Sequence, residues 1–328
     1  SLTIFVDYMN SDGDYTANEF FDELLANQNS RGIIFPKLIV SPYYLISNFD
    51  SGNIFYFLWI ILSFTLLMHF LIIKKINPKL YWTLIPIAAF LYSPLINNNY
   101  WNYSHIIMLL PGFSIVAVIY LLSKKLTTKT TIGAVGLSLV ATFSIPLALP
   151  IWIAGSFVML RTFIKNKISS LKFVLLYFSS MVVIGMLYYS GNISAQQFIP
   201  ISNLISLESF YVFTTFLAVP FKLKYSELMI FVGTVSFSLA IIIIYYLGII
   251  RKKTSELFPW ILFLIISVSA AIFMRVGRYD PHYQGDFPYY TPVAGLFQIG
   301  LCILIGVLIL DIKQQTNFNK KQLILFLL

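Results

Sequence analysis

Long apolar runs separated by short polar segments dominate the chain from residue 54 onward. A helix that crosses a bilayer needs about 20 mostly apolar residues, and a shorter run can suffice where neighbouring helices bury it. Runs of this kind lie at 54–73, 80–96, 105–123, 130–145, 147–164, 171–190, 226–250, 258–273 and 292–311. We therefore expect an all-α fold, a polytopic transmembrane helix bundle with about nine spans in this segment.

The same pattern divides the chain without suggesting a second domain. We interpret 1–328 as a single transmembrane domain, in which an acidic outer loop with an interfacial helix (1–52) precedes the membrane bundle (53–311) and a cytoplasmic segment (312–328). The first residue is Ser1, and the last six residues, LILFLL, resemble the start of a further span. We therefore expect the chain to be part of a longer protein.

Basic residues indicate how the spans are oriented. They cluster after five of the apolar runs, in the segments 74–79, 124–129, 161–172, 251–253 and 313–321. Short loops rich in Lys and Arg face the cytoplasm. All of these clusters fall on one side only if the apolar piece 208–221 does not cross, so we expect it to be re-entrant or interfacial on the outer face.

The composition supports a membrane protein, and it changes how the positive net charge is interpreted. Of the 328 residues, 58% are hydrophobic and 11% are charged, against roughly 25% charged in soluble domains. The net charge of +9 is explained by the cytoplasmic loops, so no nucleic-acid partner is expected. The single cysteine, Cys302, excludes an intrachain disulfide. We expect a multi-pass protein of a prokaryotic plasma membrane, with functional loops on the non-cytoplasmic face.

The first outer loop carries the candidate catalytic acids. The spacing Asp12-Gly13-Asp14 puts two carboxylates on one turn. Such a pair suits a divalent cation, or a general base with a supporting partner. A solvated turn is the alternative, because Asp and Gly are ordinary turn residues. Residues 18–26 form the predicted interfacial helix.

Basic residues in the outer loops are candidates for binding phosphate. Arg31 and Lys37 precede an apolar run, and Arg275 and Arg278 are three residues apart, so one helical turn can point both the same way. Arginine grips phosphate with two hydrogen bonds, whereas lysine supplies a point charge. The alternatives are snorkelling for the first pair and ion pairs with Asp280 or Asp286 for the second.

The outer loop 97–104, NNNYWNYS, is uncharged and rich in amides and aromatic rings. A sugar could stack on the rings of Tyr100 and Trp101 and accept hydrogen bonds from the Asn99 amide. Tyr289 in the last outer loop could also contact the sugar. An aromatic belt at the membrane surface is the alternative.

Several familiar patterns are missing from the sequence. It has no phosphate-cradling glycine loop and none of the patterns GxSxG, HExxH or CxxC. The predicted spans contain no run of buried acids of the kind that a proton pump or ion exchanger uses, which argues against secondary transport. No resident metal is predicted beyond the possible cation at Asp12 and Asp14. His69 lies within a predicted span, where packing or a hydrogen bond is its expected role.

The ordered set of motifs resembles a poorly characterised bacterial group of multi-pass proteins of the GT-C glycosyltransferase type. The motifs are NQNSRGIIFPKL after an acidic loop, then NNNYWNYS, TFSIPLALPIWIAGS, FLAVPF and RVGRYDPHYQGDFPYYTP. Each is loose, although together they span nearly the whole chain. The group commonly has histidines near Asn27 to Arg31, where this chain has Gln28 and Ser30, and an Arg before the final Thr, where it has Tyr289 and Tyr290.

The resemblance implies a GT-C-like fold with helical outer loops and transfer of a hexose or pentose. The donor would be a sugar on a polyprenyl phosphate, and the acceptor a glycan, lipid or protein. Asp14 would act as the base, with Asp12 as partner or substitute, while Arg275, Arg278 and Arg31 neutralise the departing phosphate.

Two other functions remain open. The chain could be a non-catalytic membrane subunit or scaffold of a larger membrane complex, which would suit the departures from the group's motifs. It could also be a polymerase, ligase or flippase for lipid-linked glycans. The nearly charge-free spans argue against a flippase, which needs a polar path through the bilayer.

Overall fold

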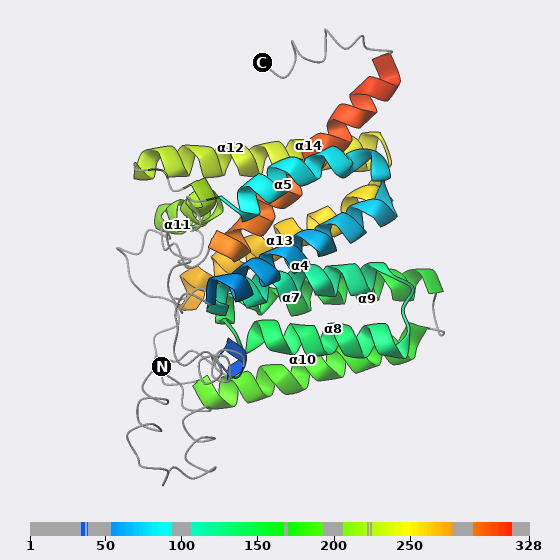
Figure 1. Ribbon diagram of the computed structural model, residues 1–328, viewed down its shortest axis with the longest axis vertical. Helices are drawn as coiled ribbons and strands as arrows, with labels where there is room; N and C mark the ends of the chain where they lie inside the picture. The colour runs from blue at the N-terminus through cyan, green and yellow to red at the C-terminus, as the bar shows by residue number, and fades with distance from the viewer. Residues whose placement is uncertain are drawn as a thin grey trace.

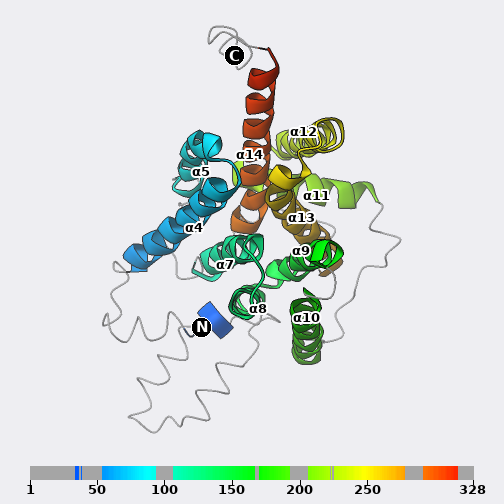
Figure 2. The same cartoon turned by 90° about the vertical axis from the view of Figure 1, so that its right-hand side faces the viewer.

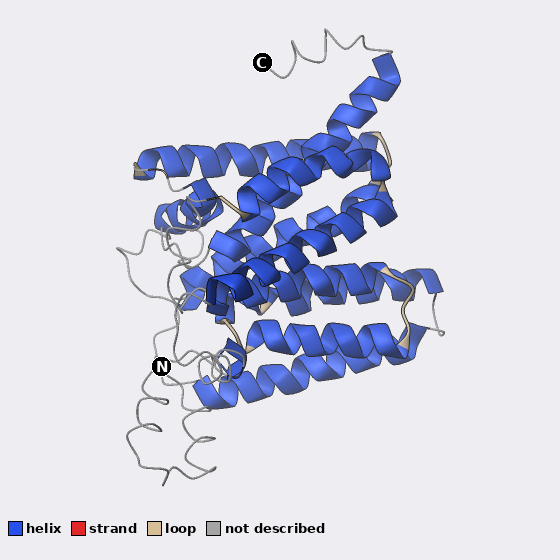
Figure 3. Cartoon of the chain, viewed as in Figure 1, coloured by secondary structure: helices blue, strands red, loops and turns tan. Residues whose placement is uncertain are grey.

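The computed structural model describes residues 34–36, 38, 54–93, 106–166, 170–192, 206–221, 223, 225–277 and 291–316. All regular secondary structure in these ranges is helical, as expected (Figure 3). The longer helices are α4 (Ile54–Ile76), α7 (Ile106–Ser123), α8 (Thr128–Thr142), α9 (Pro150–Asn166), α10 (Leu171–Asn192), α12 (Ser226–Ile244), α13 (Thr254–Gly277) and α14 (Thr291–Thr316). Shorter elements are η3 (Pro78–Thr83), α5 (Leu84–Leu91), η5 (Pro146–Ala148), α11 (Leu207–Ala218), η8 (Val219–Phe221) and the π-helical η9 (Tyr245–Ile250).

Each predicted apolar run coincides with helix, but the structure supports the span count only in part. Within the described residues, four helical stretches are long and apolar enough to cross a membrane: Tyr56–Ile76, Ser226–Ile250, Thr254–Arg275 and Pro292–Gln315. The run 80–96 is divided between η3 and α5, because Pro78 starts a 3-10 helix in which the Asn77 side chain accepts a hydrogen bond from the Lys79 N–H. The expected count of about nine spans stays a prediction.

Helices α13 and α14 form the centre of the bundle. The side chains of Trp260, Phe263 and Phe297 are fully buried there. Ser267 Oγ donates to the Val293 carbonyl oxygen at 2.7 Å and ties the two helices together. The tyrosine ring of Tyr177 on α10 is also fully buried and stacks obliquely on Trp152 of α9. The core is therefore aromatic and aliphatic, as expected for helices whose outer faces meet lipid.

The long helices run side by side and alternate in direction (Figure 1). We name the two ends of the bundle by their residues. The basic end lies on the right in Figure 1, where α4, α7, α9, η9 and α14 end. Basic residues lie in the C-terminal part of these elements or directly after them, including Lys75, Lys124, Arg161, Arg251 and Lys313. At the Arg275 end α4, α7, α9, α12 and α14 begin, and α13 ends. The basic clusters thus share one end, as the charge pattern predicts.

Helix α11 lies across the Arg275 end and does not run along the bundle. It is seen nearly end-on in Figure 1 and from the side in Figure 2, unlike its neighbours. Its approach to α12 is close, because a β-carbon added at Gly233 would lie 1.9 Å from the Thr214 carbonyl oxygen. Gln298 Nε2 of α14 donates to the Leu217 carbonyl oxygen at 2.8 Å. A non-crossing segment at 208–221 is the arrangement expected from the charges.

Candidate functional site

The Arg275 end contains a buried arginine held by two residues of α11. The Arg275 side chain is 9% exposed and belongs to the last turn of α13. Its Nε donates to Ser209 Oγ and its Nη2 donates to Glu208 Oε2, both at 3.0 Å. Glu208 precedes Arg275 by 67 residues in the chain. The sequence pattern did not indicate that the two residues interact.

Local sequence explains why these groups meet. Ser206 caps α11, since its side chain accepts a hydrogen bond from the Ser209 N–H, and Glu208 follows in the first turn. The N-terminus of a helix favours a negative charge and the C-terminus a positive one. Glu208 begins one helix and Arg275 ends another, so both helix dipoles stabilise the pair.

The two partners differ greatly in their contact with water. Glu208 is 61% exposed, whereas Arg275 is buried. Because Glu208 is already largely in contact with water, turning it away from Arg275 costs less than breaking a fully buried ion pair. A guanidinium has five N–H donors. The arrangement can therefore exchange one anion for another, with Ser209 keeping Arg275 in place.

The other predicted site residues lie outside the described residues. They are Asp12, Asp14, Arg31, Lys37, Asn99, Tyr100, Trp101, Arg278 and Tyr289, together with the interfacial helix at 18–26 and the possible cation site. Whether they come together near Arg275 stays a prediction. Among the residues that the structure does describe, no group of three or more His, Cys, Asp or Glu could hold a metal ion.

Two of the predicted outer loops connect helices that end or begin at the Arg275 end. Helix α5 leaves the bundle at this end and α7 enters it there, on either side of the segment with Tyr100 and Trp101. Likewise α13 ends and α14 begins there, on either side of the segment with Arg278 and Tyr289. The chain therefore leaves and re-enters the bundle at the Arg275 end on either side of both predicted loops.

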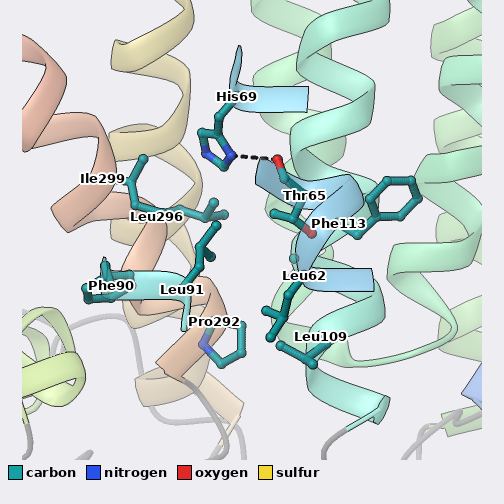
Figure 4. Close-up of a pocket in the computed structure, with 11 residues that line it drawn as sticks. Leu62, Thr65, His69, Phe90, Leu91, Leu109, Phe113, Pro292, Leu296 and Ile299 are labelled. Carbon is teal, nitrogen blue, oxygen red and sulfur yellow. Dashed lines mark hydrogen bonds between the residues drawn. The ribbon is translucent and has the colours of Figure 1, made fainter. Parts of the chain in front are cut away.

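A small apolar pocket lies among α4, α5, α7 and α14 (Figure 4). Its volume is about 30 Å³, and Leu62, Phe113, Leu296 and Ile299 are among the residues that line it. Ligand sites usually measure about 300–1,000 Å³. The pocket can hold a water molecule or a methyl group but not a sugar ring.

His69 is one of the two polar side chains that line this pocket among the described residues, together with Thr65. It is fully buried, and its Nδ1 lies 2.9 Å from the Thr65 carbonyl oxygen. Because a carbonyl oxygen only accepts, Nδ1 is the donor. Within the described residues Nε2 has no hydrogen-bond partner. The expected packing and hydrogen-bonding role agrees with this geometry.

Comparison with known proteins gives no relative from which a role could be transferred. The chain matches no protein-family model, and neither a curated protein nor a solved structure is significantly similar to it.

Proposed function

We propose that the protein is a membrane glycosyltransferase of the GT-C type, which moves a sugar from a polyprenyl phosphate to an acceptor on the non-cytoplasmic face. The observation that supports it most is the buried Arg275, whose anionic partner Glu208 is exposed and replaceable. It lies at the end of the bundle opposite the basic clusters. By the distribution of Lys and Arg, the basic end is the cytoplasmic one.

In this proposal the phosphate of the donor takes the place of Glu208 beside Arg275. Attack of an acceptor hydroxyl on the anomeric carbon breaks the sugar–phosphate bond, and the bonding electrons leave with the polyprenyl phosphate. Arg275, Arg278 and Arg31 stabilise the negative charge that develops on it, with Lys37 as a further cation. Such electrostatic stabilisation is commonly the largest contribution to catalysis.

The remaining roles belong to the acidic and aromatic loops. Asp14 accepts the proton of the acceptor hydroxyl, and Asp12 orients it or binds a divalent cation. Asn99, Tyr100, Trp101 and Tyr289 surround the sugar. These residues supply the donors, acceptors and ring faces that a sugar phosphate requires.

A second candidate function is that of a non-catalytic membrane subunit. The ion pair itself favours it, because Glu208 already neutralises Arg275 and so fastens α11 to α13. In such a subunit the same end would bind a protein partner or a glycolipid. A lipid-linked glycan polymerase, ligase or flippase has no comparable observation in its favour.

Removal of the two acids distinguishes these functions. Membrane vesicles that contain the protein receive polyprenyl phosphates carrying labelled glucose, mannose or arabinose, and the loss of label from the polyprenyl phosphate donor is measured. We expect Asp14→Asn combined with Asp12→Asn to lower the rate at least 100-fold, as loss of a general base does. The control is Asp22→Asn, which removes an acid of the same loop and should leave the rate unchanged. Equal rates in the double variant and the wild type would exclude the proposed roles.

A further inference from the structure

A large cavity lies at the basic end, far from the candidate site. Its volume is about 670 Å³, within the usual range of ligand sites. The ends of α4, α7, α9, α10 and α13 contribute to its wall, which is the face of the bundle seen in Figure 2. Its floor is apolar, with Ile119, Leu122, Val158 and Leu262. We call it the basic cavity.

Six basic side chains line the basic cavity: Lys75, Lys124, Lys125, Arg161, Lys165 and Lys172. Among the described residues, Glu256 is the only acid that lines it. Within the described part of the chain, none of the six is in an ion pair. A cleft lined by one sign of charge, with walls of low dielectric constant, concentrates counter-ions.

A second basic cluster lies at the same end of the bundle. It shows that the preference for positive charge in cytoplasmic loops does not by itself explain why the cations of the basic cavity have no paired acid. Arg251 and Lys253 both pair with Asp311, at 2.9 and 2.8 Å. The Asp311 side chain is 1% exposed, so that cluster carries its own buried counter-charge. Both clusters satisfy the preference for positive charge on the cytoplasmic side. In the basic cavity, by contrast, no described acid forms an ion pair with the cations.

Several of these cations are held in position on the wall. The Arg161 guanidinium lies over the Phe258 ring, 4.1 Å from its centroid, and the Lys124 ammonium lies over Tyr120 at the same distance. Lys75 Nζ donates to the Ser123 carbonyl oxygen. Stacking on an aromatic ring restricts the side chain while leaving the N–H groups of its edge able to bind an anion.

Glu256 does not neutralise these cations through an ion pair. Among the described residues, its Oε1 accepts a hydrogen bond from Asn77 Nδ2 at 3.3 Å, and its Oε2 is buried, out of reach of a ligand in the cavity. The cations of the basic cavity therefore stay available to an anion.

We propose that the basic cavity binds a phosphate group, held by Arg161, Lys124 and Lys165. Planar guanidinium and ammonium groups at one site are typical of phosphate recognition. The phosphate could belong to a lipid headgroup at the membrane surface or to a soluble phosphate ester. This site is separate from the proposed transfer reaction and does not depend on it.

The test uses two probes on the purified full chain in zwitterionic detergent. Phosphatidylglycerol binding is followed by native mass spectrometry, and glycerol 3-phosphate binding by calorimetry. We expect saturable binding of one molecule of at least one probe, weakened by salt. Arg161→Gln, Lys124→Gln and Lys165→Gln together should lower the affinity at least tenfold. Binding of the lipid alone identifies a headgroup site, and binding of the soluble ester identifies a site open to water.

The control removes three charges from the same end of the bundle. Lys74, Lys79 and Lys313 are exposed and do not line the basic cavity. Their combined replacement by Gln should change the affinity less than twofold. The proposal is overturned if neither probe binds the wild type saturably, or if the control variant loses as much affinity as the cavity variant.

Discussion

The ion pair between Glu208 and Arg275 can be tested by removing each partner in turn. Glu208→Ala leaves a buried guanidinium with Ser209 as its remaining partner, whereas Arg275→Met leaves Glu208 in water. Breaking a fully buried pair costs about 3–5 kcal/mol, and an exposed pair contributes about 1 kcal/mol or less. Since Glu208 is 61% exposed, we expect Glu208→Ala to lower the free energy of unfolding by about 2 kcal/mol, between these limits.

The informative quantity is the coupling between the two substitutions. In the Arg275→Met background, Glu208→Ala should cost almost nothing, so the coupling is about 2 kcal/mol, or about 30-fold in the unfolding equilibrium. Unfolding in mixed micelles of increasing SDS content, followed by circular dichroism, measures it. Glu227→Ala is the control, because Glu227 is an exposed acid in the first turn of α12. A coupling below about 0.5 kcal/mol would refute the reasoning.

Three further predictions concern the fold and its orientation. Gly233→Ala should lower the free energy of unfolding by about 3 kcal/mol through overlap with α11, whereas Gly185→Ala, with open space around it, should change it little. Asp311→Asn should cost about 2 kcal/mol in the same SDS titration, because two paired cations lose their counter-charge. In intact cells that express a variant without Cys302, a membrane-impermeant maleimide should label Glu227→Cys but not Lys252→Cys. The reverse pattern would contradict the predicted orientation of the bundle in the membrane.

The positions of the helices could be predicted from sequence because they depend on local pattern. The apolar run 54–73 corresponds to α4, and the break between Pro146 and Pro150 separates α8 from α9. The sequence also predicted that the segment 208–221 does not run along the bundle, because only a non-crossing segment keeps all the basic clusters on one side. Boundaries were less certain where proline starts a tighter helix, as Pro78 does in η3.

Contacts between distant segments could not be predicted in this way. The sequence offered ion pairs with Asp280 or Asp286 only as the alternative to phosphate binding at Arg275, and both acids lie outside the described residues. It did not point to Glu208, the partner that the structure describes. The only local signal was an acid in the first turn of a helix capped by Ser206. The basic cavity escaped prediction for the same reason, since neighbouring helix ends are determined by packing.

The side of the membrane on which donor is consumed tests the central claim most directly. Purified protein is inserted into vesicles sorted by orientation, and labelled polyprenyl phosphate sugars are added to the outer leaflet with a membrane extract as acceptor. The proposal predicts that polyprenyl phosphate is released when the Arg275 end faces outward, and that release stops in the Asp12→Asn, Asp14→Asn variant. Release only when the basic end faces outward, or from no donor in either orientation, would contradict it.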